Sequence, residues 1–146
     1  MKTLTLFITK QSTLIFTMFI AFFAPIKGMV FLVGLSTILD TCFGIWRAYQ
    51  MDEIITSRKA RFGLVPKIVA YCSAVCLIYA TDVYMINDLT KMAVSVDFIS
   101  TKLIALLLIS IEVKSMDESF QAVKGYSFIE KIKVLILKAK DIKKEL

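Results

Sequence analysis

The segment from Ser12 to Trp46 is almost wholly apolar, and it constrains the fold more than any other part of this 146-residue chain. One α-helix of that length would extend about 50 Å, because an α-helix rises about 1.5 Å per residue. The hydrocarbon core of a bilayer is only about 30 Å thick, so a membrane-crossing segment this long must break. Pro25 and Gly28 favour a break, and Lys27 between them favours the headgroup region. The sequence therefore predicts two helices, near residues 6–25 and 28–47.

The overall composition extends this prediction to the whole chain. Hydrophobic residues make up 58% of it and the mean hydropathy is +0.74, whereas soluble domains are about 45–50% apolar. A chain this short has no core large enough to bury the excess. Two further apolar segments predict helices near residues 64–86, with Pro66 in the first turn, and near 94–120. We therefore expect an all-α integral membrane protein with about four spans, the first retained and not cleaved as a signal peptide.

The last twenty residues follow a different pattern. Apolar side chains recur at helical spacing, and most of the lysines fall off that stripe. The pattern predicts a transmembrane domain over residues 1–125 followed by a cytoplasmic basic amphipathic helix over 126–146. The lysines expected on its polar face are Lys131, Lys133, Lys138 and Lys140. An anionic lipid surface, a partner protein or plain solvent would each suit such a helix.

The distribution of positive charge predicts the topology. Four spans put both termini and the central polar loop on one side of the membrane. Of the 18 Lys and Arg residues, only Lys27, Lys91 and Lys102 then fall on the other side. Positively charged residues concentrate on the cytoplasmic side. We therefore expect a multi-pass membrane protein with both termini in the cytoplasm.

The residue types exclude several kinds of chemistry. The chain has no His, which rules out a Ser-His-Asp site or a histidine metal site. Cys42, Cys72 and Cys76 lie in apolar segments and are interpreted as packing residues. There is no Gly-rich phosphate loop, and basic residues do not alternate with aromatic ones as nucleic-acid binding would favour. We expect no enzymatic activity, no cofactor, no metal and no nucleic-acid partner.

Ionisable residues inside the predicted spans are the candidates for function. A charged side chain near the bilayer centre costs at least about 2.5–3.5 kcal/mol, so it needs a partner or water. The candidates for a helix contact or a pore-facing position are Ser36, Asp40, Gly44, Glu112, Ser115 and Glu118. The candidates for charge compensation are Arg58, Arg61 and Lys67. Asp40 could equally be a polar anchor that only holds two helices together.

These residues resemble a motif pattern of the phage lysis and toxin-secretion holins. In that family an early span ends in Asp and, four residues later, Gly, as in Asp40 and Gly44. A loop with Ser, a basic residue and Gly then leads to a Lys that opens the next span, as in Ser57, Arg58, Gly63 and Lys67. A late span ends with Glu, Ser and Glu at three-residue steps, as in Glu112, Ser115 and Glu118. Two positions depart from the pattern: Phe43 precedes the Gly where the family often has Thr, and Ser119 follows the second Glu where it often has Asn.

The resemblance implies a protein that forms homo-oligomers in the bacterial inner membrane and opens lesions through which an endolysin or toxin passes. Two other functions also fit the residues. The chain could be a membrane scaffold or anchor whose tail helix binds a partner protein. It could also be a small ion-channel or transporter subunit that uses Asp40 and Glu112.

Overall fold

The computed structural model describes residues 2–90 and 96–145, with side chains over 11–56, 58, 61–88 and 96–138. Within these ranges all the regular secondary structure is helical, with no β-strand. The elements are α1 (Lys2–Phe23), the 3₁₀ segment η1 (Ala24–Ile26), α2 (Lys27–Gln50), α3 (Ser57–Thr81), the π-helical segment η2 (Asp82–Ile86), α4 (Asn87–Thr90), α5 (Ile99–Lys124) and α6 (Phe128–Glu145). The all-α class expected from the sequence is therefore confirmed.

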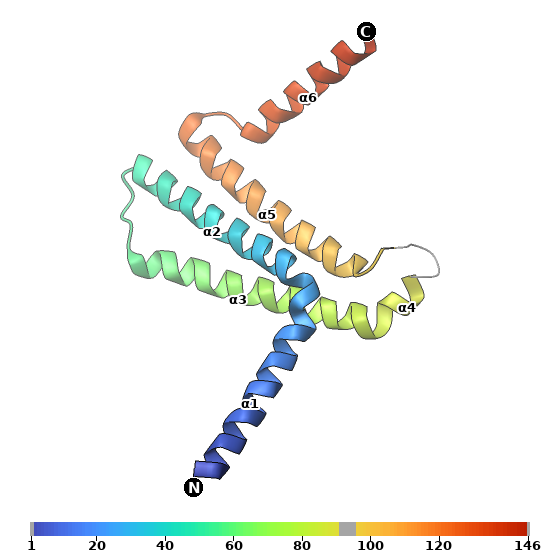
Figure 1. Cartoon of the computed structure of the whole chain (residues 1–146). Helices are drawn as coiled ribbons and strands as arrows, with labels where there is room; N and C mark the ends of the chain where they lie inside the picture. The colour runs from blue at the N-terminus through green and yellow to red at the C-terminus, as the bar shows by residue number, and fades with distance from the viewer. Residues whose placement is uncertain (1, 91–95, 146) are drawn as a thin grey trace.

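The helices α2, α3 and α5 form the central bundle, with α2 and α5 running in the same direction and α3 running against them (Figure 1). Small and β-branched residues fill the narrow space between them, including Val33 of α2, Val75 of α3 and Ala105 of α5. At the end of the bundle near η1 lies an aromatic cluster, in which the Tyr79 hydroxyl donates a hydrogen bond to the Phe22 carbonyl at 2.9 Å. Packing of this kind holds three helices together with few large side chains.

The break predicted near Pro25 is present as the 3₁₀ segment η1, which separates α1 from α2. Proline has no N–H to donate, so it fits this short turn. Beyond η1, α1 points away from the bundle and does not pack along it (Figure 1). Its large apolar side chains from Leu14 to Ile20 are mostly exposed.

The polar loop between the second and third predicted helices is shorter than expected. The sequence placed a loop over Arg47–Arg61, but α2 continues to Gln50 and α3 begins at Ser57. Polar residues therefore extend both helices past their apolar parts, because helical hydrogen bonding does not require an apolar side chain. Pro66 consequently lies inside α3 and not in its first turn, so that prediction was wrong.

The second predicted polar loop, from Asn87 to Lys91, is also partly helical. Residues Asn87–Thr90 form α4, which follows the π-helical segment η2 directly. The predicted start of the fourth helix near Val94 lies outside the described residues, and α5 begins at Ile99. Phe98 before it and Gly125 after it both have a left-handed backbone conformation, with φ of 56° and 76°. At Gly125 this conformation is a common way to end a helix.

Two helical segments, Gln11–Gln50 and Arg61–Ile86, are long and apolar enough to cross a membrane. The first of them includes parts of both α1 and α2. The helix α5 has a similar length but carries several charged residues in its second half. The bundle is covered by apolar side chains, such as Phe31 of α2, Leu77 of α3 and Leu106 of α5, which are more than half exposed. Such an exterior is unusual for a soluble protein and suits a lipid environment.

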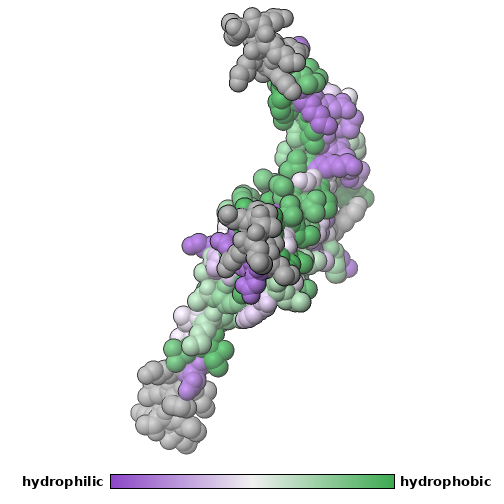
Figure 2. Space-filling view, turned by 90° about the vertical axis from the view of Figure 1, so that its right-hand side faces the viewer, coloured by the Kyte–Doolittle hydropathy of each residue, from purple (hydrophilic) through white to green (hydrophobic). Residues whose placement is uncertain are grey.

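The last helix, α6, extends away from the bundle (Figure 1). Figure 2 shows hydrophilic side chains along one side of α6 and hydrophobic ones along the other. Lys131, Lys133 and Lys138 are exposed, as are Ile132 and Leu135, whereas the side chain of Lys140 lies outside the described set. The predicted amphipathic helix is therefore present and makes few contacts with the bundle.

Candidate functional site

Three charged side chains meet inside the bundle and form what we call the triad: Asp40, Lys67 and Glu112. The Lys67 Nζ lies 2.9 Å from Asp40 Oδ2 and 3.2 Å from Glu112 Oε2, and it donates a hydrogen bond to each. The three residues come from α2, α3 and α5 in turn, so a single ammonium group links all three helices of the bundle.

The local sequence explains how each side chain reaches this point. Asp40 lies one helical turn after Ser36 and Thr37, which are buried and satisfy their hydroxyls on the Val33 carbonyl of their own helix. The face of α2 that carries Asp40 is therefore the buried one. Lys67 has a long flexible stem, which lets its ammonium reach across to the other two helices.

Burial of the triad is strongly asymmetric. The side chain of Glu112 is fully buried and that of Asp40 is 11% exposed, whereas that of Lys67 is 39% exposed. The second oxygen of Glu112, Oε1, is buried and has no hydrogen-bond partner among the described residues. The triad thus combines two acids with one cation, and its Glu112 side chain is shielded from solvent.

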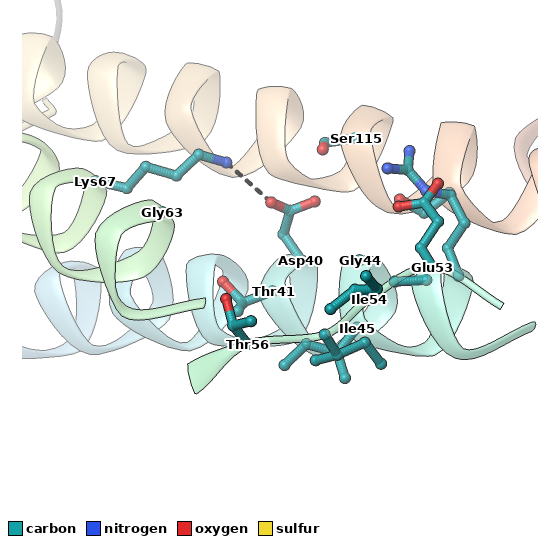
Figure 3. Close-up of a pocket in the computed structure, with 14 residues that line it drawn as sticks. Asp40, Thr41, Gly44, Ile45, Glu53, Ile54, Thr56, Gly63, Lys67 and Ser115 are labelled. Atoms are coloured by element: carbon teal, nitrogen blue, oxygen red, sulfur yellow. Dashed lines mark hydrogen bonds and ion pairs between the residues drawn. The ribbon is translucent and has the colours of Figure 1, made fainter. Parts of the chain in front are cut away.

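A pocket of about 300 Å³ opens next to the triad, between α2, the loop after it and the adjoining ends of α3 and α5. Figure 3 shows Asp40 extending from α2 toward Lys67, with Ser115 of α5 nearby. Glu53 from the loop and Ser119 of α5 also line the pocket. Its walls are polar on the triad side, so it offers water a route to Asp40.

Most of the candidates named from the α2 and α5 motifs lie on the inner faces of the bundle. Ser36 and Asp40 are buried, and Ser115 lines the pocket with Gly44. The expected close approach of another helix at Gly44 is not seen within this chain, because a Cβ built there would meet no atom within 4 Å. Within the chain itself, α3 and α5 cover much of this face of α2.

Glu118 does not join this group. Its side chain is 64% exposed and pairs loosely with Lys114, one turn earlier on α5, at 3.9 Å. Glu112 and Glu118 differ by about 120° around the helix, since consecutive residues turn by about 100°. That difference is enough to turn Glu118 out of the bundle while Glu112 points into it.

Of the three basic residues named for charge compensation, the structure brings Lys67 to both acids. Arg58 and Arg61 are exposed near the start of α3. They lie about one and a half to two and a half turns before Lys67 along the same helix.

A further buried acid, Asp82, was missed by the sequence analysis. Its side chain is completely buried where α3 passes into η2. Its Oδ2 accepts hydrogen bonds from the backbone N–H and the hydroxyl of Thr101, at 2.7 Å and 2.6 Å. Asp82 therefore caps the first turn of α5 from another helix. The rule that flagged Asp40 also applied to Asp82, because it lay inside the predicted span over 64–86.

Another buried acid, Asp117, fixes the start of α6. Its carboxyl accepts hydrogen bonds from the Ser127 hydroxyl at 2.6 Å and from the Phe128 N–H at 2.7 Å. The Ser127 hydroxyl in turn accepts from the Glu130 N–H at 3.0 Å, as an N-cap residue does. The sequence pattern of a Ser three residues before a Glu signals such a cap, and it was also missed.

No protein-family model matches this chain, and no match was found among the curated proteins or the solved structures. Among the described residues, no three His, Cys, Asp or Glu side chains come together as a set that could hold a metal ion.

Proposed function

We propose that this chain is a holin-like protein, which self-associates in a bacterial inner membrane and opens lesions that release an endolysin or toxin. One observation carries the proposal. The residues on which the resemblance depends come from three separate parts of the sequence, yet Asp40, Lys67 and Glu112 meet at one ammonium group. A motif set whose members converge in space in this way behaves as one structural unit.

The surface of the molecule supports a site of action within lipid. Large apolar side chains cover the outside of α2, α3 and α5 and are exposed in the isolated chain. Three charged groups of the bundle, Asp40, Lys67 and Glu112, in contrast meet in its interior. This inside-out distribution favours a membrane-embedded bundle whose polar interior is closed in the resting state.

The triad gives the bundle two arrangements with very different polarity. While it is closed, one lysine holds the two carboxyls inside the protein. If the helices separate, the same polar face of Ser36, Asp40 and Ser115 becomes available to line a water-filled space between copies. Lesion opening is then a rearrangement that exchanges contacts within one chain for contacts with water and with neighbouring chains.

The proposed topology has four spans with both termini in the cytoplasm. In it, α1 crosses the membrane and η1 is the turn on the outer side. The basic side of α6 lies on the anionic inner leaflet, where each Lys or Arg near the surface contributes about 1 kcal/mol of binding. The charges of Lys131, Lys133 and Lys138 support this placement.

The test is inducible expression in a bacterium, with membrane potential and release of a cytoplasmic reporter enzyme measured together. A lesion-forming protein collapses the potential and releases the enzyme. The Glu118→Gln variant is a matched control that should behave as the native chain does, because Glu118 lies outside the triad. Normal growth at high membrane levels of the chain would contradict the proposal.

A selective ion pathway is the second candidate, favoured by the pocket that Asp40, Lys67 and Ser115 line. The same experiment separates the two functions. Ion flux without release of the reporter enzyme, lost on Asp40→Asn substitution, would support a channel subunit. Release of the whole enzyme would exclude a selective pathway, since a path that passes a folded protein cannot discriminate between ions.

A further inference from the structure

The triad contains two acids and one base within a single hydrogen-bonded group. With both carboxyls ionised, it would carry a net negative charge inside the bundle. The remaining charged and titratable groups facing it are few: Arg47 of α2 and Glu53 of the loop line the adjoining pocket, and Tyr71 of α3 faces Glu112. Arg47 and Glu53 have opposite charges, so the two pocket residues add no net charge that could balance the second acid.

The two carboxyls also lie close to each other. Asp40 Oδ2 and Glu112 Oε2 lie 2.9 Å and 3.2 Å from the same Lys67 Nζ, so the two oxygens are at most about 6 Å apart. Two ionised carboxyls this close repel each other, and binding one proton relieves the repulsion.

One oxygen of the Glu112 carboxyl is buried without a hydrogen-bond partner in the described part of the chain. Its Oε1 has no hydrogen-bond partner among the described residues, and the side chain has no solvent exposure. An unpartnered oxygen of a buried ionised group is far more costly than one of a neutral carboxyl group. A proton bound by the Asp40–Glu112 pair therefore lowers the cost of burying both acids beside one lysine.

We infer that Asp40 and Glu112 form a proton-binding site in which one shared proton leaves a single negative charge opposite Lys67. Water in the pocket next to Asp40 provides the route by which the proton exchanges with the loop end of the bundle. This inference depends on the geometry of the triad and not on whether the protein opens lesions.

The first test is infrared spectroscopy of the purified full-length chain in lipid nanodiscs. A protonated carboxyl has a C=O stretching band distinct from that of a carboxylate, and the band shifts in D₂O. We expect such a band in the native chain at neutral pH. Either Glu112→Gln or Asp40→Asn should remove it, because each leaves one carboxyl and one lysine, which need no proton. The Glu118→Gln variant should retain the band.

The second test measures the proton through stability. If the folded chain holds one more proton than the unfolded chain at neutral pH, raising the pH destabilises the fold. The unfolding equilibrium constant of the native chain should then rise about tenfold more per pH unit than that of Glu112→Gln, which corresponds to one proton.

Two results would overturn the inference. One is a folded native chain without a protonated-carboxyl band at neutral pH. The other is a band that survives both Glu112→Gln and Asp40→Asn but disappears in Asp82→Asn, which would assign the proton to the buried acid at the other end of the bundle. Because the native chain and two independent variants are compared, failure of one variant to fold leaves the test decisive.

Discussion

Both ends of the bundle bury acidic side chains, but they bind them by different means. At the pocket end, Asp40 and Glu112 bind the ammonium of Lys67 next to a pocket. At the capped end, Asp82 binds the N–H and hydroxyl of Thr101 amid aromatic side chains. An ion pair depends on charge and can be undone by a proton or by water, whereas a helix cap depends on one acceptor atom. The pocket end is therefore suited to change, and the capped end to hold the helices in place.

Removing the cation at the pocket end should have the largest effect. Substituting Lys67→Met leaves two carboxyls facing each other without a base, and loss of one partner of a buried ion pair costs about 3–5 kcal/mol. We expect the lower end of that range, because the lysine side chain is 39% exposed. Unfolding in mixed micelles can be followed through the fluorescence of Trp46, the only tryptophan of the chain.

The matched control for this substitution is Lys114→Met, which removes an exposed lysine that pairs only loosely. Lys67→Arg should retain most of the stability because it keeps a cation near both acids. Equal losses for the methionine variants of Lys67 and Lys114 would show that the triad contributes nothing particular to the fold.

Removing the acceptor at the capped end should have a smaller effect. We expect Asp82→Ala to destabilise the chain by about 1–2 kcal/mol, which is typical of losing a helix cap and leaving a buried N–H unpaired. Hydrogen exchange should accelerate at the first turn of α5, near Thr101. Asp82→Asn keeps an acceptor oxygen and should lose less. If the asparagine variant were as unstable as the alanine variant, Asp82 would stabilise the fold through its charge and not through capping.

A third substitution separates the bundle from its tail. Asp117→Ala removes the acceptor for the Ser127 hydroxyl and the Phe128 N–H, so the start of α6 should loosen at a cost of about 1 kcal/mol. Faster hydrogen exchange is expected at residues 127–130 and not at Thr101. Acceleration at both places would mean that α6 and the capped end unfold together, contrary to the small contact between α6 and the bundle.

The sequence predicted the helical class, the break at Pro25 and the amphipathic tail, because each depends on a local pattern of apolar and charged residues. It also singled out Asp40, Glu112 and Lys67, since a charge in an apolar segment needs a partner. It did not show that Lys67 binds both acids at once, which depends on how three helices pack. Pro66 was misplaced because hydropathy marks where a helix is apolar and not where its hydrogen bonding begins.

The smallest effect is expected at Glu118, and it tests whether burial is what sets the triad apart. Glu118 and Glu112 are the same residue type on the same helix, and each has a lysine partner. Glu118 is 64% exposed, however, and an exposed pair at i, i+4 contributes only about 0.3–0.5 kcal/mol. Glu118→Gln should therefore change the unfolding free energy by no more than that, and high salt should abolish the difference. A loss as large as that of Lys67→Met would mean that position along α5, and not enclosure within the bundle, decides the contribution of an acid.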